Sequence, residues 1–361
     1  MKKNLFPILP STKNVIGILG GGQLGKMTAM AATKLGFKTY LYCPKGDNPA
    51  EEVVSKVYHG SWSDLEKIDR FASNVVCATS EFENVPSPVL DRISKITYVF
   101  PNAKVFKNAQ NRDREKKLAT QAGFKLPKWY KVNKFKDFEK YSKELNFHAI
   151  LKTNSLGYDG KGQGIVNSEK NLQKIWDDIN SKDCVLEQKI NFNRELSILY
   201  AKSADESECF FPISENVHEN GILRKTIAPA FVDARTLNKI KKLTKNLAKI
   251  INLTGLLTIE MFQLDDENIL FNEIAPRPHN SFHWTIEGCK NSQFDILIQS
   301  ICGHKIKDET SSGLWEMQNI LGKEVKILQQ LSSDEKINCH IYGKKEIKEG
   351  RKMGHYTKKI N

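Results

Sequence analysis

The first hundred residues alternate between short apolar runs and amphipathic stretches. The apolar runs are rich in β-branched and aromatic residues, which predicts strands, and they lie at 14–19, 38–43, 54–60 and 74–79. The stretches 23–36 and 63–72 space their apolar residues three or four positions apart, which predicts helices. Strands that alternate with helices form βαβ units, so the pattern predicts a parallel sheet.

From about Lys131 the alternation becomes irregular, which indicates a second domain. Helices are predicted at 109–123, 136–145, 169–180 and 236–251. Strands are predicted at 126–132, 148–153, 184–190, 194–203, 208–213, 256–264 and 269–275. A third, small piece begins near Cys302. We therefore expect an α/β first domain over 1–110, an α+β second domain over 111–301 and a small third domain over 302–361.

Composition narrows the class of protein. The 361 residues are 40% hydrophobic, enough for a sizeable core, and the seven cysteines form no C-x-x-C pair. We expect a reduced, cytoplasmic protein without a disulfide framework, a signal peptide or a membrane span. The formal charge of +13 comes from lysines spread along the chain, which favours a solvated basic surface over a nucleic-acid groove.

The run "VIGILGGGQLGKM" (15–27) carries Gly20-x-Gly22-x-x-Gly25 directly after a predicted strand. This spacing is typical of dinucleotide-binding turns, which also need an acidic residue at the end of the second strand. That strand ends at Cys43-Pro44, and the next carboxylate, Asp47, lies past a turn. NAD binding is therefore disfavoured, whereas a phosphate or another anion still suits a helix N-terminus. A tight turn without any ligand is the alternative.

A second glycine-rich segment, "LKTNSLGYDGKGQGIV", spans 151–166. Its four glycines free the backbone to fold over phosphates, and Lys152 and Lys161 supply charge. An ordinary hairpin with a loose tip is the alternative.

A carboxylate pair follows in "TIEMFQLDDENILFNEIA" (258–275). A four-residue turn at 265–268 would place Leu264 opposite Ile269 and Phe262 opposite Phe271. Glu260 would then lie opposite Glu273, on the same face as the two phenylalanines. Opposed carboxylates destabilise a hairpin unless a cation lies between them, and oxygen ligands suit Mg²⁺ with phosphate. His279 and His283 are not expected as metal ligands, because Pro276 and Pro278 oppose a regular helix.

Five segments together resemble a known family. They are "GILGGGQLGKM", "EFENVP", "GYDGKGQ", "NEIAPRPHNSFHWTIE" and "YGKKEIKEGRKMGH". In this order they are similar to N5-carboxyaminoimidazole ribonucleotide synthetase, the ATP-grasp ligase of purine biosynthesis. The resemblance implies a Rossmann-like domain, an ATP-grasp domain and a small C-terminal domain, and a cytoplasmic homodimer. The implied reaction converts ATP, bicarbonate and 5-aminoimidazole ribonucleotide to N5-carboxyaminoimidazole ribonucleotide, ADP and phosphate.

The resemblance also implies roles for individual residues. ATP contacts are implied for Arg112, Lys152, Gly157, Tyr158, Asp159, Gly160, Lys161, Gly162, Gln163, Glu187, Gln188, Lys189, Ile190, Glu195, His218, Asn272 and Glu273. Ribonucleotide contacts are implied for Gln23, Leu24, Glu81, Tyr158, Asp159, Arg277, His279, Asn280, Lys344, Arg351 and Lys352. Mg²⁺ is expected on Glu260 and Glu273, and catalytic roles on Lys152, Asp159, Arg277 and Lys344. Leu156 and Phe282 depart from the family pattern, so the flap over ATP would be stiffer and the substrate side narrower or repacked.

Three alternatives remain. Another ATP-grasp ligase, such as formate-dependent glycinamide ribonucleotide transformylase, would share the glycine turn and the Glu pair but would not need "GRKMGH". An NAD-dependent oxidoreductase would need the missing acidic residue after the second strand. A basic binding protein without catalysis would not need Glu260 opposite Glu273.

Overall fold

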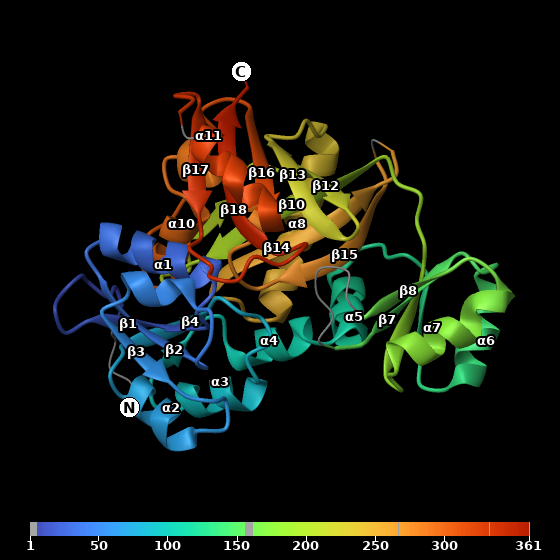
Figure 1. Ribbon diagram of the computed structural model, residues 1–361, viewed down its shortest axis with the longest axis horizontal. Helices are drawn as coiled ribbons and strands as arrows, with labels where there is room; N and C mark the ends of the chain where they lie inside the picture. Colours follow the sequence, from blue (N-terminus) through green and yellow to red (C-terminus); the bar gives the residue numbers. More distant parts are fainter. Residues whose placement is uncertain (1–5, 156–161, 266, 332, 361) are drawn as a thin grey trace.

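The computed structural model describes residues 6–155, 162–265, 267–331 and 333–360, and all structural statements concern these residues. Their strands form a five-stranded, a four-stranded and a nine-stranded sheet. Figure 1 shows the five-stranded and four-stranded sheets at opposite ends of the molecule, with the nine-stranded sheet between and above them. The α/β class with α+β character in its second part is confirmed.

The N-terminal sheet has the order β3-β2-β1-β4-β5, and all its strand pairs are parallel. Its strands are β1 (Val15–Leu19), β2 (Lys38–Cys43), β3 (Lys56–His59), β4 (Cys77–Ser80) and β5 (Tyr98–Val99). The helices of this region are α1 (Gln23–Lys34), the 3₁₀ turn η1 (Pro49–Val53), α2 (Leu65–Ala72), α3 (Ser87–Ser94) and α4 (Ala103–Ala109). Every residue of β1 is buried, as expected for a parallel strand covered on both faces, so the βαβ prediction is confirmed.

The four-stranded sheet is antiparallel and has the order β6-β9-β7-β8. Its elements are β6 (Trp129–Val132), α6 (Phe135–Glu144), β7 (Ala149–Thr153), β8 (Gln163–Val166), η2 (Glu169–Asn171), α7 (Leu172–Ile179) and β9 (Cys184–Gln188). Phe138 of α6 and Ile175 of α7 bury against Leu151 and Leu186 of the sheet. This lobe therefore has a hydrophobic core of its own.

The nine-stranded sheet is antiparallel, with the order β15-β14-β10-β12-β13-β16-β18-β17 and β11 paired to β10. Its strands are β10 (Arg194–Lys202), β11 (Glu208–Phe210), β12 (Ser214–Glu219), β13 (Ile222–Ala228), β14 (Gly255–Gln263), β15 (Ile269–Ala275), β16 (Trp315–Leu321), β17 (Ile337–Ile341) and β18 (Lys352–Lys359). The remaining helices are α5 (Arg112–Ala122), α8 (Ala234–Ile250), η3 (Asn280–Phe282), α9 (Thr285–Gly288), α10 (Gln293–Ile301), η4 (Gly322–Ile327) and α11 (Leu328–Leu331). The strands after Cys302 thus extend a sheet that begins in the preceding segment, through the pairing of β13 with β16.

Helices cover both faces of the nine-stranded sheet. Residues of α5 and α8 share one core with Ile259 of β14 and Phe271 of β15. Residues of α10 share another core with Leu199 of β10 and with α1 of the N-terminal sheet. Because α1 and α10 pack together, the N-terminal sheet is joined to the nine-stranded sheet by a common apolar core.

Helix boundaries differ from the sequence prediction at two places. The helix expected over 109–123 is α5 and begins three residues later, at Arg112, because the Asn111 side chain caps it by accepting from the Arg114 N–H. Ala109 instead ends the separate helix α4. The helix expected over 169–180 begins with the 3₁₀ turn η2. Gly123 ends α5 in the left-handed conformation (φ 97°), as its position predicted.

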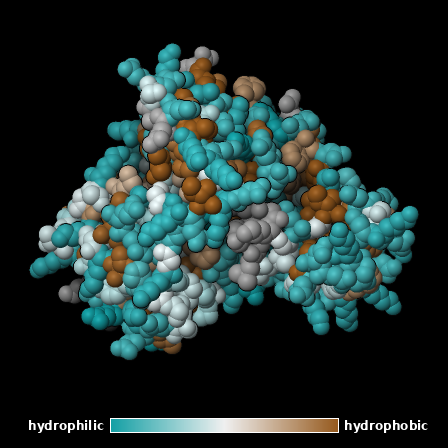
Figure 2. All heavy atoms as spheres, in the orientation of Figure 1, coloured by the Kyte–Doolittle hydropathy of each residue, from teal (hydrophilic) through white to brown (hydrophobic). Residues whose placement is uncertain are grey.

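All seven cysteines are free thiols, in agreement with the predicted absence of a disulfide framework. Among the described residues, no helix has the length and apolar character needed to cross a bilayer. Hydrophilic residues dominate the face drawn in Figure 2, which fits a lysine-rich solvated surface.

Candidate active site

The predicted carboxylate pair lies in the β14–β15 hairpin. Glu260 is the pairing partner of Glu273, which confirms the predicted pair. The register that led to this pairing is wrong, because Gln263 lies opposite Ile269 and Met261 opposite Phe271. A β-bulge on the β15 side, at Asn272, takes up the one-residue difference before Glu273 is reached.

The bulge also changes which side chains share a face with the carboxylates. Phe271 and Met261 point into the core beneath the sheet. Phe271 therefore does not share the face of the glutamates, contrary to the sequence prediction. Phe262, two residues from Glu260, stacks instead on Phe192 with 4.7 Å between ring centroids. An unpaired residue in a hairpin reverses the side-chain alternation beyond it, which a count of residues across the turn does not reveal.

Burial and mutual repulsion dominate the electrostatics of this pair. Burial, followed by the charge of Glu273, raises the pKa of Glu260 to about 8. The His279 Nε2 atom lies 3.3 Å from Glu260 Oε1, and burial lowers the pKa of His279 well below its ordinary value. The neutral imidazole of His279 adds no charge to the pair, and two opposed carboxylates offer the oxygen ligands that suit a divalent cation.

Helix α5 holds the hairpin from the other side. Arg112 Nη1 lies 3.5 Å from Glu273 Oε2, and the Ile274 N–H donates to Glu115 Oε1 at 2.6 Å. Burial and the charge of Glu273 raise the pKa of Glu115 to about 8. The predicted ATP residue Arg112 and the predicted metal residue Glu273 are therefore brought together by one helix and one strand.

A buried chain of charges connects α5 to the four-stranded sheet. Lys116 Nζ and Lys152 Nζ lie 3.1 Å and 2.9 Å from the two oxygens of Glu187. Burial alone would raise the pKa of Glu187, but the two lysines and Arg112 lower it to about 2. Burial lowers the pKa of Lys152. The predicted phosphate contact Lys152 is thus held by Glu187, itself a predicted ATP residue.

The other predicted ATP residues line neighbouring strands. His218 Nδ1 contacts Glu195 Oε2. Burial lowers the pKa of His218, but the hydrogen bond to Glu195 and the charges of the nearby glutamates raise it overall. Glu195 of β10 lies two strand-pairing positions from Glu260 of β14 in the same sheet, because Glu260 pairs with Ser197. Gln188 is exposed at the end of β9, where the Lys189 N–H donates to the carbonyl of His148. Ile190 follows in the connection to β10.

Part of the predicted flap lies outside the described residues. This applies to Leu156, Gly157, Tyr158, Asp159, Gly160 and Lys161. Gly162 has a left-handed backbone (φ 69°), and a Cβ there would come within 2.8 Å of Thr153 Oγ1. Gln163 is exposed and pairs with Lys152 across the β7–β8 ladder. We call Arg112, Lys152, Glu187, Glu195, His218, Asn272 and Glu273 the ATP wall.

The glycine turn after β1 holds a carboxylate of the protein itself. Glu81, directly after β4, accepts from the Gly22 N–H at 2.9 Å and from the Gly25 N–H at 3.2 Å. A Cβ on Gly20 or Gly22 would lie within 3 Å of Glu81 Oε1. The anion expected at this helix N-terminus is therefore Glu81, which stands where a dinucleotide pyrophosphate would need the same N–H groups.

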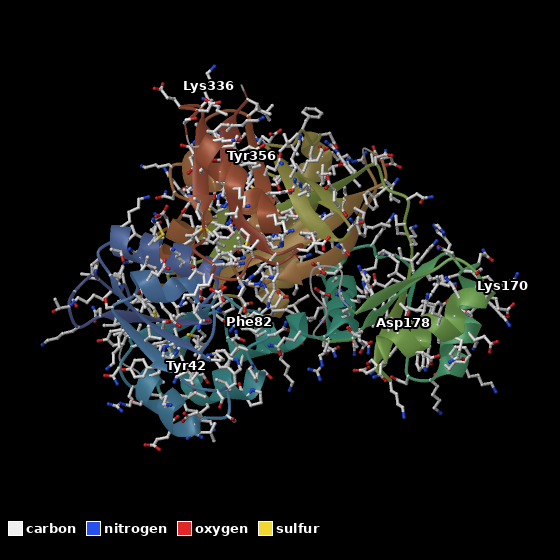
Figure 3. All side chains as sticks on the ribbon, viewed as in Figure 1. Tyr42, Phe82, Lys170, Asp178, Lys336 and Tyr356 are labelled. Atoms are coloured by element: carbon white, nitrogen blue, oxygen red, sulfur yellow. The ribbon has the colours of Figure 1, made fainter. Side chains whose placement is uncertain are left out.

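Glu81 also interacts with two basic residues of the site, Arg277 and Lys344. Burial raises the pKa of Glu81, against the two N–H groups and the charges of Arg277 and Lys344, which lower it. Gln23 begins α1 beside it. The Leu24 side chain is buried in the core below, so only its main chain faces the turn. Phe82, labelled in Figure 3, is 43% exposed directly after Glu81.

Arg277, His279 and Asn280 follow β15 without forming a regular helix, as the prolines predicted. Arg277 Nη2 donates to Glu83 Oε2 at 2.8 Å, and Asn280 Oδ1 lies 3.0 Å from His283 Nε2. Phe282 is fully buried in the core shared with α1 and packs near Phe211. The Phe282 side chain therefore lies in this core.

The basic loop before β18 closes onto the N-terminal sheet. Arg351 Nη1 donates to Asp47 Oδ2 at 2.8 Å, and Lys344 Nζ donates to the Lys352 carbonyl at 2.7 Å. Burial and the nearby charge of Arg351 lower the pKa of Lys344 to about 8. Gly343 and Gly350 have positive φ angles, as the predicted turns required. We call Gln23, Glu81, Arg277, His279, Asn280, Lys344, Arg351 and Lys352 the ribonucleotide wall.

Four residues of this network were not predicted as site residues. Glu83 and Asp47 each hold an arginine of the ribonucleotide wall. Glu115 and Lys116 hold β15 and Glu187 on the ATP wall. A signal existed for Glu83, which lies in the segment "EFENVP" that carries the family resemblance. Another existed for α5, where Glu115 and Lys116 occupy buried positions of the helix.

Three family models match the chain in succession. They are the ribonucleotide synthetase preATP-grasp domain at residues 13–110, the ATP-grasp domain at 117–294 and the phosphoribosylaminoimidazole carboxylase C-terminal domain at 316–359.

Curated relatives carry consistent names. N5-carboxyaminoimidazole ribonucleotide synthase of Bacillus subtilis is 37% identical over 95% of this chain and 90% of its own length. The bifunctional purine synthesis protein purC/E of Dictyostelium discoideum is 36% identical over 95% of this chain, which spans 37% of that longer protein.

The chain is also similar to solved structures of N5-carboxyaminoimidazole ribonucleotide synthases. N5-carboxyaminoimidazole synthetase from Staphylococcus aureus in complex with ADP has a TM-score of 0.93 at 34% identity, with 98% of this chain and 94% of that chain covered. The synthase from Aspergillus clavatus, in complex with ADP and 5-aminoimidazole ribonucleotide, has a TM-score of 0.88 at 26% identity, with 96% and 94% covered.

Proposed function

Because the chain belongs to the N5-carboxyaminoimidazole ribonucleotide synthase family of ATP-grasp ligases, we propose that it carboxylates 5-aminoimidazole ribonucleotide with ATP and bicarbonate in purine biosynthesis. The products are N5-carboxyaminoimidazole ribonucleotide, ADP and phosphate. A contact between the two walls carries the proposal: Glu260 is paired with Glu273 of the ATP wall and lies 3.3 Å from His279 of the ribonucleotide wall. A γ-phosphoryl group held by the first wall would therefore lie beside a substrate held by the second.

Mg²⁺ fits the residues present. Glu260 and Glu273 offer two opposed carboxylates, and burial followed by the charge of Glu273 raises the pKa of Glu260. We propose that these two glutamates hold Mg²⁺, with Asn272 on the bulge beside them. When bound, the ion supplies charge neutralisation at the phosphate oxygens of ATP.

The first chemical step is transfer of the γ-phosphoryl group of ATP to bicarbonate, which gives carboxyphosphate and ADP. Such a transfer depends mainly on positioning and charge neutralisation. Lys152 and Arg112 neutralise the phosphates, and Glu187 keeps Lys152 in place through the 2.9 Å contact. Glu187 to Ile190 contact adenine, and Glu195 and His218 contact the ribose side. The flap from Gly157 to Gln163 excludes water from the reactive intermediate.

In the second step the exocyclic amine of the ribonucleotide attacks the carboxyl carbon of carboxyphosphate. The new C–N bond replaces the C–O bond to phosphate, which leaves as inorganic phosphate, and the amine loses a proton. Arg277 presents a fork of donors suited to bicarbonate or carboxyphosphate, and Glu83 orients it at 2.8 Å. Glu81, His279 and Asn280 position the ribose and base, and Lys344, Arg351 and Lys352 the 5′-phosphate. The resemblance also implies ribonucleotide contacts for Tyr158 and Asp159, which lie outside the described residues.

We further propose that the protein acts as a cytoplasmic homodimer, with domains over 1–110, 111–301 and 302–361.

The proposal is tested by measuring ADP release with Mg-ATP and bicarbonate, with and without 5-aminoimidazole ribonucleotide. We expect fast release only when the ribonucleotide is present, together with incorporation of labelled bicarbonate into an acid-labile product. Equal ADP release when formate and glycinamide ribonucleotide replace these substrates would favour the transformylase alternative. Saturable NADH binding in the micromolar range would favour the oxidoreductase alternative.

A further inference from the structure

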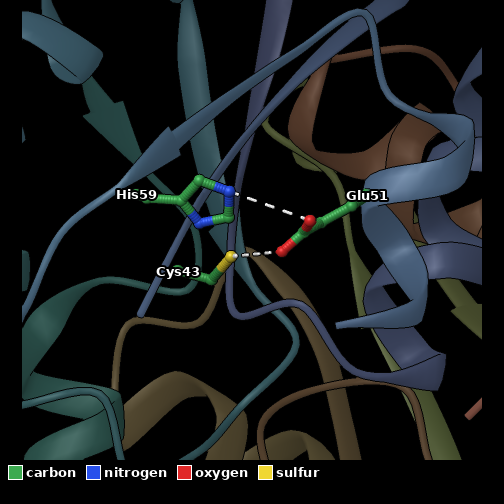
Figure 4. Close-up of side chains that lie close together, drawn as sticks. All are labelled: Cys43, Glu51 and His59. Atoms are coloured by element: carbon green, nitrogen blue, oxygen red, sulfur yellow. Dashed lines mark hydrogen bonds and ion pairs between the residues drawn. The ribbon is translucent and has the colours of Figure 1, made fainter. Parts of the chain in front are cut away.

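A second cluster of ligating side chains lies in the N-terminal sheet and shares no residue with either wall. Cys43 ends β2 and His59 ends β3, and these two residues are partners in the parallel ladder. Glu51 comes from η1, which folds back over the same sheet edge. One donor atom from each residue lies within 4.8 Å of the other two, and Figure 4 shows the three side chains converging.

The polar atoms of these three side chains make only long contacts with one another. The Cys43 thiol donates a long hydrogen bond to Glu51 Oε1 at 3.9 Å. Glu51 Oε2 is 3.7 Å from His59 Nε2, a distance that is too long for a hydrogen bond. His59 Nδ1 is buried without a hydrogen-bond partner. Within the described part of the chain, His59 is also the sole ion-pair partner of Glu51, whereas the adjacent Glu52 pairs with Lys26 at 2.6 Å.

The spacing suits a tetrahedral metal ion. Zinc binds sulfur at about 2.3 Å and nitrogen or oxygen at about 2.0–2.2 Å. A tetrahedral angle then separates sulfur from oxygen by about 3.5 Å and nitrogen from oxygen by about 3.3 Å. The observed distances of 3.9 Å and 3.7 Å run to different carboxylate oxygens of Glu51, so binding requires a rotation of this carboxylate that turns one oxygen toward both Cys43 Sγ and His59 Nε2. In the structure, one donor atom from each residue lies within 4.8 Å of the other two.

The sulfur, nitrogen and oxygen atoms of the three side chains indicate which metal the cluster would bind. A thiolate with an imidazole favours zinc over Mg²⁺ or Ca²⁺, which prefer oxygen ligands alone. The side chains of Glu51 and His59 are about one-third exposed, at 33% and 34%, so a water molecule can reach a fourth position. Asn48 Nδ2 donates to Glu51 Oε1 at 2.8 Å and supports this ligand from outside.

We propose that Cys43, Glu51 and His59 bind one zinc ion, with water as the fourth ligand. Binding forms a zinc–sulfur bond and releases the Cys43 thiol proton to solvent, without any change of oxidation state. The ion would join the ends of β2 and β3 to η1. It would thereby brace the loop 44–48, in which Asp47 holds Arg351 at 2.8 Å.

Metal content and cobalt spectra test the site directly. The full-length protein, stripped with a chelator and titrated with Zn²⁺, should retain one zinc per chain after gel filtration. With Co²⁺ it should show the intense thiolate-to-cobalt charge-transfer band of a sulfur-ligated tetrahedral site. Cys43→Ser should abolish the band, and the matched control Cys184→Ser, a buried strand cysteine in the four-stranded lobe, should keep it.

Two further variants keep the proposal falsifiable if Cys43→Ser fails to fold. Glu51→Gln changes a partly exposed carboxylate without changing its size and should abolish zinc retention. Asn48→Ala should weaken zinc binding by about 10- to 100-fold. Zinc retained by Glu51→Gln, a cobalt spectrum without a thiolate band, or the same band in Cys43→Ser would each overturn the proposal. Glu273→Gln should leave zinc content and spectrum unchanged, which separates this site from the Mg²⁺ site.

Discussion

The two walls of the active site differ in how deeply their ion pairs are buried. On the ATP wall, Lys152 and Glu187 are 11% and 4% exposed, and Lys116 behind them is 1% exposed. On the ribonucleotide wall, Arg351 and its partner Asp47 are 25% and 14% exposed. Buried charges are costly to leave unpaired, whereas partly hydrated ones are not. Substitutions at the buried pairs around Glu187 should therefore affect folding, and substitutions at the partly exposed pair of Arg351 and Asp47 should affect substrate binding.

The largest effect is expected where both walls meet. Glu273→Gln should leave the fold intact and reduce ADP formation by about a thousandfold or more, because Mg²⁺ loses one of its two fixed carboxylates. Glu267→Gln in the same hairpin, where the glutamate side chain is 69% exposed, serves as the control and should be active. Near-normal turnover of folded Glu273→Gln would contradict the metal assignment.

Lys116→Met tests the buried pairing of the ATP wall. The substitution leaves Glu187 with one cation in place of two, and should lower the free energy of unfolding by about 3–5 kcal/mol. Chemical denaturation followed by circular dichroism measures this loss. Lys117→Met removes a neighbouring lysine that is 66% exposed and should cost less than about 1 kcal/mol. Equal costs for the two variants would mean that burial does not distinguish the walls.

Arg351→Ala tests the ribonucleotide wall. The charge-assisted phosphate contact is worth about 1.5–3 kcal/mol, so the KM for the ribonucleotide should rise by roughly ten- to over a hundredfold. The KM for ATP should stay within about twofold, and stability should change by less than about 1 kcal/mol because the pair with Asp47 is partly hydrated. Steady-state kinetics with each substrate varied in turn gives both constants. Lys348→Ala, in the same loop but 67% exposed, should change neither constant. An effect on the ATP constant alone would move the loop to the other substrate.

The smallest effect concerns pH. With its pKa lowered to about 8, Lys344 is cationic below that pH and loses its charge as the pH rises through it. The kcat/KM for the ribonucleotide should therefore fall above about pH 8, by up to about tenfold per pH unit. Lys344→Arg keeps its charge in this range and should flatten the profile. The same decline in Lys344→Arg would show that another group titrates.

Local features of the site could be predicted from sequence because they depend on near neighbours. The apolar runs indicated β1, β2, β14 and β15, and the glycines indicated turns such as the positive φ at Gly123. The opposed pair Glu260 and Glu273 was also predicted, but through a register that the bulge at Asn272 corrects. A bulge depends on how both faces of the hairpin pack, and this information is absent from the count of residues across a turn.

Partners far apart in the sequence could not be predicted in the same way. The contact between Asp47 and Arg351 spans 304 positions, and the contact between Glu81 and Gly22 spans 59. Nothing near Gly22 indicates that its N–H group is taken by a carboxylate from the end of β4, since a free turn for phosphate has the same local pattern. The sequence by itself determined which segments become strands, helices and glycine turns, because backbone preferences and apolar periodicity are local. Only the tertiary structure decided which charge meets which, because that depends on how three sheets pack around one site.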